Sequence, residues 1–71
     1  MENYVSDVQK LKTIIADDSF DPNIRIEAIK ALGKVGTNEA MQELLNIIAN
    51  DKANILDRKE AWKQVGKVLK F

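Results

Sequence analysis

The sequence predicts an all-α fold in which four helices form two stacked antiparallel helical-hairpin repeats, as in an α-solenoid. Three observations predict it: the sequence repeats every 33 residues, apolar residues recur at helical spacing in four segments, and capping residues separate those segments. No segment shows the two-residue alternation of a half-buried strand. Because 71 residues suffice for only one domain, residues 1–71 are expected to fold as a single unit.

The repeat aligns residues 7–38 with residues 40–71 without a gap, and 13 of the 32 aligned pairs are identical. A period of about 20 to 50 residues is typical of stacked units, none of which buries its apolar face alone. We call these segments the first and the second unit. Among the identical positions are Asp18/Asp51, Arg25/Arg58 and Gly33/Gly66.

The first two predicted helices span residues 4–17 and 22–35. Asp21 is the expected N-cap of the second helix, Pro22 suits its first position, and Gly36 is expected to end it. The apolar positions at helical spacing are Tyr4, Val8, Leu11 and Ile15 in the first helix, and Ile24, Ala28, Leu32 and Val35 in the second.

The last two predicted helices span residues 38–50 and 55–70. Thr37 directly follows the helix-ending glycine as the next N-cap, so the second and third helices are expected to form a tight hairpin. Asn54, with Asp57 three residues later, resembles a capping box. The apolar positions are Met41, Leu44, Leu45 and Ile48 in the third helix, and Trp62, Val65 and Leu69 in the fourth.

The stretch from Asp21 onwards resembles the HEAT-like repeats that also occur in relatives of the phycobilin lyases. The matching features are an arginine, an alanine-rich middle, Leu-Gly, a following glycine, and a later Leu-Leu with a closing aspartate. In the register of that family a repeat begins near Asp21 and contains two helices. The second copy in this register has Trp62 in place of Ile29 and ends before its second helix. The resemblance implies a scaffold for protein partners. It also implies that the repeated arginines and aspartates brace one repeat against the next rather than bind an anion.

Gly33 and Gly66 lie inside predicted helices, where glycine costs about 0.5–1 kcal/mol relative to alanine. We therefore expect a neighbouring helix to pack too closely there for a side chain. The alternative is a ligand that approaches the backbone, although neither glycine belongs to a phosphate-binding loop.

The composition excludes most familiar catalytic chemistry. The chain has no cysteine and no histidine, which excludes disulfides, thiolate nucleophiles, histidine triads and the usual zinc and haem ligand sets. The carboxylates form no recognisable acid–base pair or metal-binding loop, so we predict no enzyme activity, no cofactor and no metal. With no signal peptide and no long apolar run, a cytoplasmic protein without a membrane partner is expected.

The leading functional interpretation is a non-enzymatic protein–protein interaction module, either an adaptor or a regulator. In solenoids of this type, partners usually bind the inner surface, where the polar candidates are Gln9, Gln42 and Asn46. Trp62 is a fourth candidate. We expect it to close the core at the C-terminal end, whereas an exposed tryptophan would be a binding anchor.

The alternative function is nucleic-acid or phosphate binding by a lysine-rich face. Four lysines follow one another at steps of four, four and three in the last helix, and two more occupy matching positions in the first unit. A net charge of zero and the lack of interleaved aromatic residues favour a merely solvated face. The six lysines are Lys30, Lys34, Lys59, Lys63, Lys67 and Lys70.

Charge is distributed unevenly along the chain. Residues 1–21 carry five acidic and two basic residues, whereas residues 52–71 carry two acidic and six basic residues. One hypothesis is self-association, or docking to a partner, through the open C-terminal end. Terminal helices that cap the stack are the competing explanation. Beside protein binding and nucleic-acid binding, a third functional hypothesis is that the module is a fragment or an immunity-type inhibitor of a larger enzyme.

Overall fold

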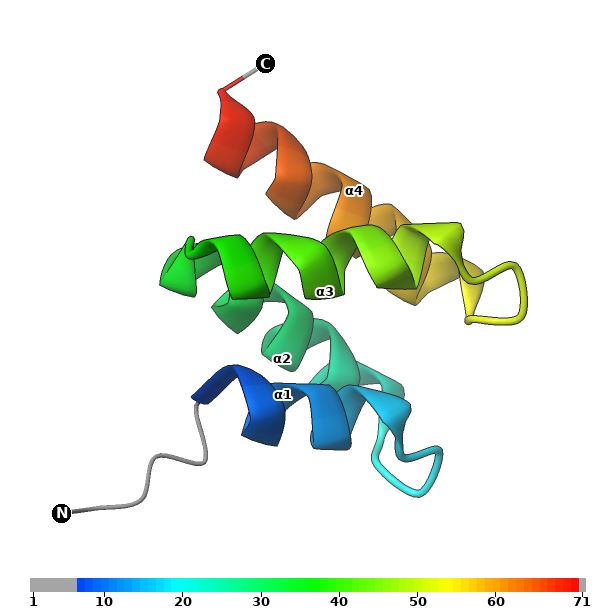
Figure 1. Ribbon diagram of the computed structural model, residues 1–71. Helices are drawn as coiled ribbons and strands as arrows, with labels where there is room; N and C mark the ends of the chain where they lie inside the picture. Colours follow the sequence, from blue (N-terminus) through cyan, green and yellow to red (C-terminus); the bar gives the residue numbers. More distant parts are fainter. Residues whose placement is uncertain (1–6, 71) are drawn as a thin grey trace, which may run out of the picture.

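The structure is a computed structural model that describes residues 7–70, and this part of the chain forms four α-helices (Figure 1). They are α1 (Asp7–Ala16), α2 (Pro22–Val35), α3 (Asn38–Ala49) and α4 (Ile55–Leu69). The predicted all-α fold is confirmed, and α2, α3 and α4 begin and end within one residue of their predicted bounds. Tyr4, a predicted member of the first helix, lies outside the described residues.

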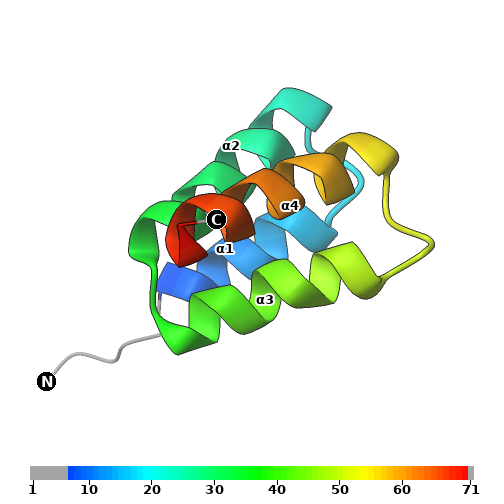
Figure 2. The ribbon, with the colours of Figure 1, turned by 90° about the horizontal axis from the view of Figure 1, so that it is seen from above.

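The second unit stacks on the first. The first unit contributes α1 and α2, and the second contributes α3 and α4, which lie above them in Figure 1. α3 runs in the same direction as α1, and α4 runs in the same direction as α2 (Figure 2). The most extensive helix contact is between α2 and α4. The 33-residue repeat is therefore a repeat of helix pairs that stack on each other.

α2 and α4, the second helices of the two units, begin with the same kind of capping turn. Asp21 Oδ1 accepts a hydrogen bond from Asn23 N at 2.7 Å, and α2 begins there. Asn54 Oδ1 accepts one from Leu56 N at 2.8 Å, and α4 begins there. Each side chain satisfies an amide that the first helical turn leaves without an acceptor. Both predicted N-caps are confirmed.

The connection between α2 and α3 turns within two residues. Gly36 has a φ of 68°, in the left-handed region that favours glycine, and its N–H donates to the Leu32 carbonyl oxygen at 3.2 Å. Thr37 Oγ1 then accepts a hydrogen bond from Ala40 N at 3.2 Å and caps α3. The tight hairpin that the sequence predicts is confirmed.

The hydrophobic core lies between the two units and draws on all four helices. Ile29, Leu32 and Leu44 are its largest fully buried side chains, and apolar residues of α1 and α3 pack around them. Full burial of one such side chain contributes about 1.5–3 kcal/mol. The buried cluster consists of Val8, Ile29, Leu32, Ala40, Leu44, Ala61 and Val65.

Five of the apolar residues that recur at helical spacing are exposed, and Trp62 is one of them. Ile24 and Val35 lie on the side of α2 that no described helix covers, and Ile24 is 47% exposed. Leu45 in α3 and Leu69 in α4 are exposed as well. Helical spacing shows which residues share a side, but neighbouring helices determine which side is covered. The buried residues of α2 are Arg25, Ala28, Ile29 and Leu32.

α2 and α4 approach each other closely at Gly33. A Cβ atom there would lie 2.8 Å from Gln64 Cδ and 3.0 Å from Gln64 Cβ, so this side chain occupies the space that a methyl group needs. Gln64 is buried, and its Nε2 donates to Glu60 Oε2 at 2.7 Å. Close helix packing, rather than an approaching ligand, therefore explains Gly33, as predicted.

Candidate protein-binding surfaces

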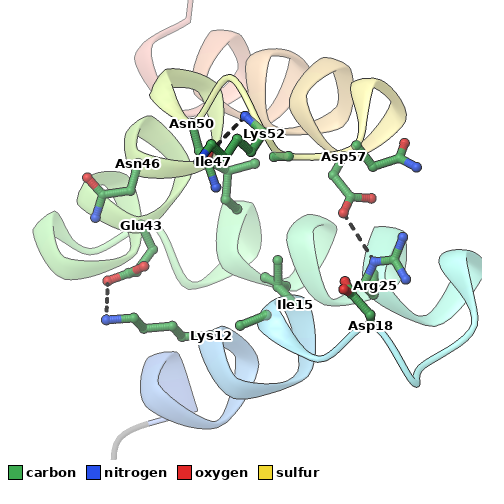
Figure 3. Close-up of a pocket in the computed structure, with 13 residues that line it drawn as sticks. Lys12, Ile15, Asp18, Arg25, Glu43, Asn46, Ile47, Asn50, Lys52 and Asp57 are labelled. Carbon is green, nitrogen blue, oxygen red and sulfur yellow. Dashed lines mark hydrogen bonds and ion pairs between the residues drawn. The ribbon is translucent and has the colours of Figure 1, made fainter.

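A groove of about 350 Å³ lies where the C-terminal ends of α1 and α3 approach each other (Figure 3). We call it the inter-unit groove, because its walls come from equivalent parts of the two units. Its lining combines charged, amide and aliphatic side chains. Figure 3 labels Lys12, Ile15, Asp18, Arg25, Glu43, Asn46, Ile47, Asn50, Lys52 and Asp57.

A buried ion pair joins the two units at this groove. Arg25 Nε donates to Asp57 Oδ2 at 3.2 Å, and Arg25 Nη1 donates to the Phe20 carbonyl oxygen at 2.9 Å. The two charged side chains are only 9% and 7% exposed. Asp57 Oδ1 is buried and accepts no hydrogen bond from the described residues. Arg25 thus braces one unit against the next, as the resemblance implies, and its partner is Asp57.

This pairing corrects two sequence-based expectations. Asp57 does not complete a capping box with Asn54, because its carboxylate is directed to the buried guanidinium of Arg25 in α2. Asp18 and Asp51 are exposed, and no described hydrogen bond or ion pair joins either of them to an arginine. The bracing role is therefore wrong for these two aspartates.

The polar groups at the rim of the inter-unit groove are largely engaged with one another. Lys12 Nζ lies 3.6 Å from Glu43 Oε2, and Asn50 Oδ1 accepts a hydrogen bond from Lys52 N at 3.0 Å. In the described part of the chain, no three acidic, histidine or cysteine side chains are grouped so that they could hold a metal ion.

The structure does not gather the predicted inner-surface residues into one site. Asn46 lines the inter-unit groove. Gln9 lies outside it, and its Nε2 donates to Glu39 Oε2 at 3.4 Å. Gln42 is exposed on α3 and is not part of the groove lining. Partner binding by Gln9, Gln42 and Asn46 therefore stays a prediction.

A second groove, of about 360 Å³, lies at the open end of the stack, on α4 and the adjoining side of α3. We call it the end groove. Its apolar part is formed by Trp62 and two isoleucines, and three basic side chains surround that part. No described acidic residue lines it. The end groove consists of Ile48, Ile55, Arg58, Lys59, Trp62 and Lys63.

Trp62 does not close the core, so that expectation is wrong. The side chain is 61% exposed, whereas Ile29, its counterpart in the first unit, is 0% exposed. Ile29 is buried because the second unit covers its side of α2. The corresponding side of α4 is covered by no helix in the described part of the chain (Figure 2). Trp62 therefore occupies a stacking position that is open.

Five of the six lysines are distributed over two separate grooves. One lies between α2 and α4 and includes Glu27, whose Oε2 is 3.3 Å from Lys30 Nζ. The other is the end groove, where lysines adjoin apolar side chains. The nucleic-acid alternative stays a prediction. The first groove contains Lys30, Lys34 and Lys67, the end groove contains Lys59 and Lys63, and Lys70 follows α4.

The sequence reasoning missed the neighbours of Trp62 in the end groove, namely Ile48, Ile55 and Arg58. The alignment of the two units could have identified two of these residues. Arg58 aligns with Arg25 and Ile48 with Ile15, and both counterparts line the groove between the units. The positions of the first unit that face the second unit correspond to positions of the second unit that face outward.

Comparison with known proteins agrees with this architecture. The family model for HEAT repeats matches residues 5–64, a segment that contains α1, α2 and α3 and reaches into α4. No curated protein and no solved structure matches the chain significantly. None of the described helices is long and apolar enough to cross a lipid bilayer.

Proposed function

Since this chain belongs to the HEAT-repeat family, we propose that it is a small protein-interaction module that binds its partner at the end groove. HEAT repeats generally mediate protein–protein interaction. The observation that carries the proposal is the exposure of Trp62, at 61%, in a position where the first unit buries its isoleucine completely.

The chemistry of the end groove suits a protein partner. Tryptophan is enriched among the residues that dominate interface energies, and truncation of such an anchor costs about 2 kcal/mol or more. Ile48 and Ile55 extend the apolar surface around it, and the basic residues at its edge supply a polar rim. The proposal includes a non-enzymatic adaptor or regulatory role in the cytoplasm, which a composition without cysteine and histidine favours.

The test compares three immobilised forms of the chain in a lysate of the native host. Wild type is compared with Trp62→Ala and with the control Leu56→Ala, which removes a similarly exposed apolar side chain of α4 that does not line the end groove. We expect the wild type and Leu56→Ala to retain the same protein and Trp62→Ala to lose it. Circular dichroism establishes that all three forms are folded.

Two outcomes would contradict this proposal. If Trp62→Ala retains the same protein as the wild type does, the binding surface lies elsewhere. Retention that weakens steeply with salt and is lost in Lys30→Glu with Lys34→Glu would favour the lysine groove and an anionic partner, because such binding releases counterions.

A further inference from the structure

Both ends of the two-unit stack present an apolar side to solvent. At one end is the end groove with Trp62. At the other is the outer side of α2, which carries Ile24, Ala31 and Val35 and which we call the outer face of α2. We propose that the partner of the end groove is the outer face of α2, with the adjoining α1, in a second molecule of this chain. This inference rests on the end groove being the binding surface and names its occupant.

The contact between α2 and α4 provides the template for this docking. In that contact α2 contributes Arg25, Ile29 and Gly33, and α4 contributes residues that include Asp57 and Gln64. A second molecule stacked in the same way would place its first unit on α3 and α4, because the two units are related by one repeat.

The 33-residue shift predicts the residues that would meet. On α4 the positions of Arg25, Ile29 and Gly33 are occupied by Arg58, Trp62 and Gly66. On the second molecule's α2, the positions of Asp57, Ala61 and Gln64 are occupied by Ile24, Ala28 and Ala31.

The side chains at these positions differ in size from those of the template. Trp62 is larger than Ile29, and Ala31 is smaller than Gln64, which in the template packs against Gly33; the space that Ala31 leaves therefore lies opposite Gly66, one turn of α4 from Trp62. Gly66, like Gly33, leaves room for close approach of the two backbones. The exposed Ile24 replaces the buried carboxylate of the template, so the intermolecular contact is more apolar than the internal one.

The proposed contact between α3 and the second molecule's α1 is also more apolar than the internal contact between α1 and α3. In the internal stack, Lys12 of α1 faces Glu43 of α3 at 3.6 Å. The same register between molecules pairs Leu45 of α3 with Lys10 of the second molecule's α1. The aliphatic stem of a lysine can cover an exposed leucine while its ammonium group stays in water. This pairing gives the exposed Leu45 a partner.

Charge favours this orientation over contact between two end grooves. The end groove contains Arg58, Lys59 and Lys63 and no acidic residue among those described. Two such grooves face to face would bring six positive charges together, and like charges across an interface are unfavourable. The outer face of α2 adjoins Glu27, which is paired with Lys30, so this face adjoins charges of both signs rather than positive charges alone.

Sedimentation of two variants, alone and mixed, tests the proposal. Trp62→Asp blocks only the end groove, and Ile24→Asp blocks only the outer face of α2; both residues are exposed, so the fold should survive. We expect the wild type to associate with rising concentration, each variant alone to stay monomeric, and an equimolar mixture to form a dimer through its one intact pair of faces. Leu56→Asp, on α4 but outside both faces, should associate like the wild type.

Three results would overturn the proposal. The first is a wild type that stays monomeric at all concentrations. The second is association of Ile24→Asp alone, which would show contact between two end grooves. The third is a mixture in which both variants stay monomeric although the wild type associates. If one of these results is obtained and a host protein still binds through Trp62, the proposed function stands. Only a second molecule of this chain is then excluded as the partner.

Discussion

Arg25 and Asp57 show how one pair of residues determines the stacking of the two units. The aspartate stands where the first unit has Ile24, so the second unit carries a charge at a position that can be apolar. Removing a buried charge from water is costly, and here the cost is offset by the opposite charge at 3.2 Å and by the Phe20 carbonyl oxygen.

Breaking this pair should destabilise the fold strongly. Asp57→Ala leaves the Arg25 guanidinium buried without its counter-charge, which should lower the free energy of unfolding by about 3–5 kcal/mol. Arg25→Met combined with Asp57→Ile, an apolar pair, should recover most of that loss. Urea denaturation of the two variants and the wild type measures both effects. A loss below about 1 kcal/mol in Asp57→Ala would show that the pair is not buried as described.

Gly33 and Gly66 offer a matched comparison at equivalent positions. Gly33→Ala pushes a methyl group into Gln64 and should destabilise the protein by about 1–3 kcal/mol, partly offset by the better helix propensity of alanine. Gly66→Ala, at the position of α4 that the repeat assigns to the side facing away from the first unit, should instead stabilise it by about 0.5–1 kcal/mol at dilute concentration. Thermal unfolding distinguishes the two, and equal effects would contradict the contact described for Gly33.

The loop after α1 contains a carboxylate with a perturbed pKa. Hydrogen bonds from the Ser19 hydroxyl at 2.7 Å and the Ser19 amide at 2.9 Å lower the pKa of Asp17 below its ordinary value. The charged form thus favours folding; its contribution is full above the ordinary pKa and is lost as the pH falls through the folded-state pKa. Ser19→Ala should raise the pKa of Asp17, as an NMR titration of its carboxyl carbon would show. An unchanged pKa would mean that the hydroxyl does not bind the carboxylate.

The capping residues in the sequence predicted the helix boundaries well. Asp21, Gly36, Thr37 and Asn54 act locally, so the sequence near each boundary contains the information that sets it. The side of a helix that faces the core depends instead on helices distant in the sequence. For this reason the apolar spacing that identified α2 does not show that Ile24 is exposed.

The four helices should differ in local stability. α1 has ten residues and only Val8 buried, whereas α2 and α4 contact each other extensively and bury four and five residues. Helices with little buried surface open most readily. Amide hydrogen exchange in dilute protein should therefore be fastest in α1. Equal protection of α1 and α2 would show that the stack unfolds only as a whole.

The alignment of the two units predicts the position of the candidate site better than the types of the individual residues do. Residue types alone suggested the lysines and the inner polar residues, which the structure distributes over separate surfaces. Alignment of the two units marks the positions of α4 that would face a further unit, among them Trp62. Whether such a position is covered depends on what stacks there, and local sequence contains no signal for that.

The proposed stacking requires that another unit covers the end groove. Because the chain has one tryptophan, its fluorescence reports on this surface alone. In a dilution series, we predict the emission of an exposed indole at low concentration. At high concentration we predict a shift to shorter wavelength with reduced acrylamide quenching, which Ile24→Asp abolishes and Leu56→Asp retains. Sedimentation that shows association while the emission of Trp62 stays constant would contradict the claim, because the molecules would then meet through another surface.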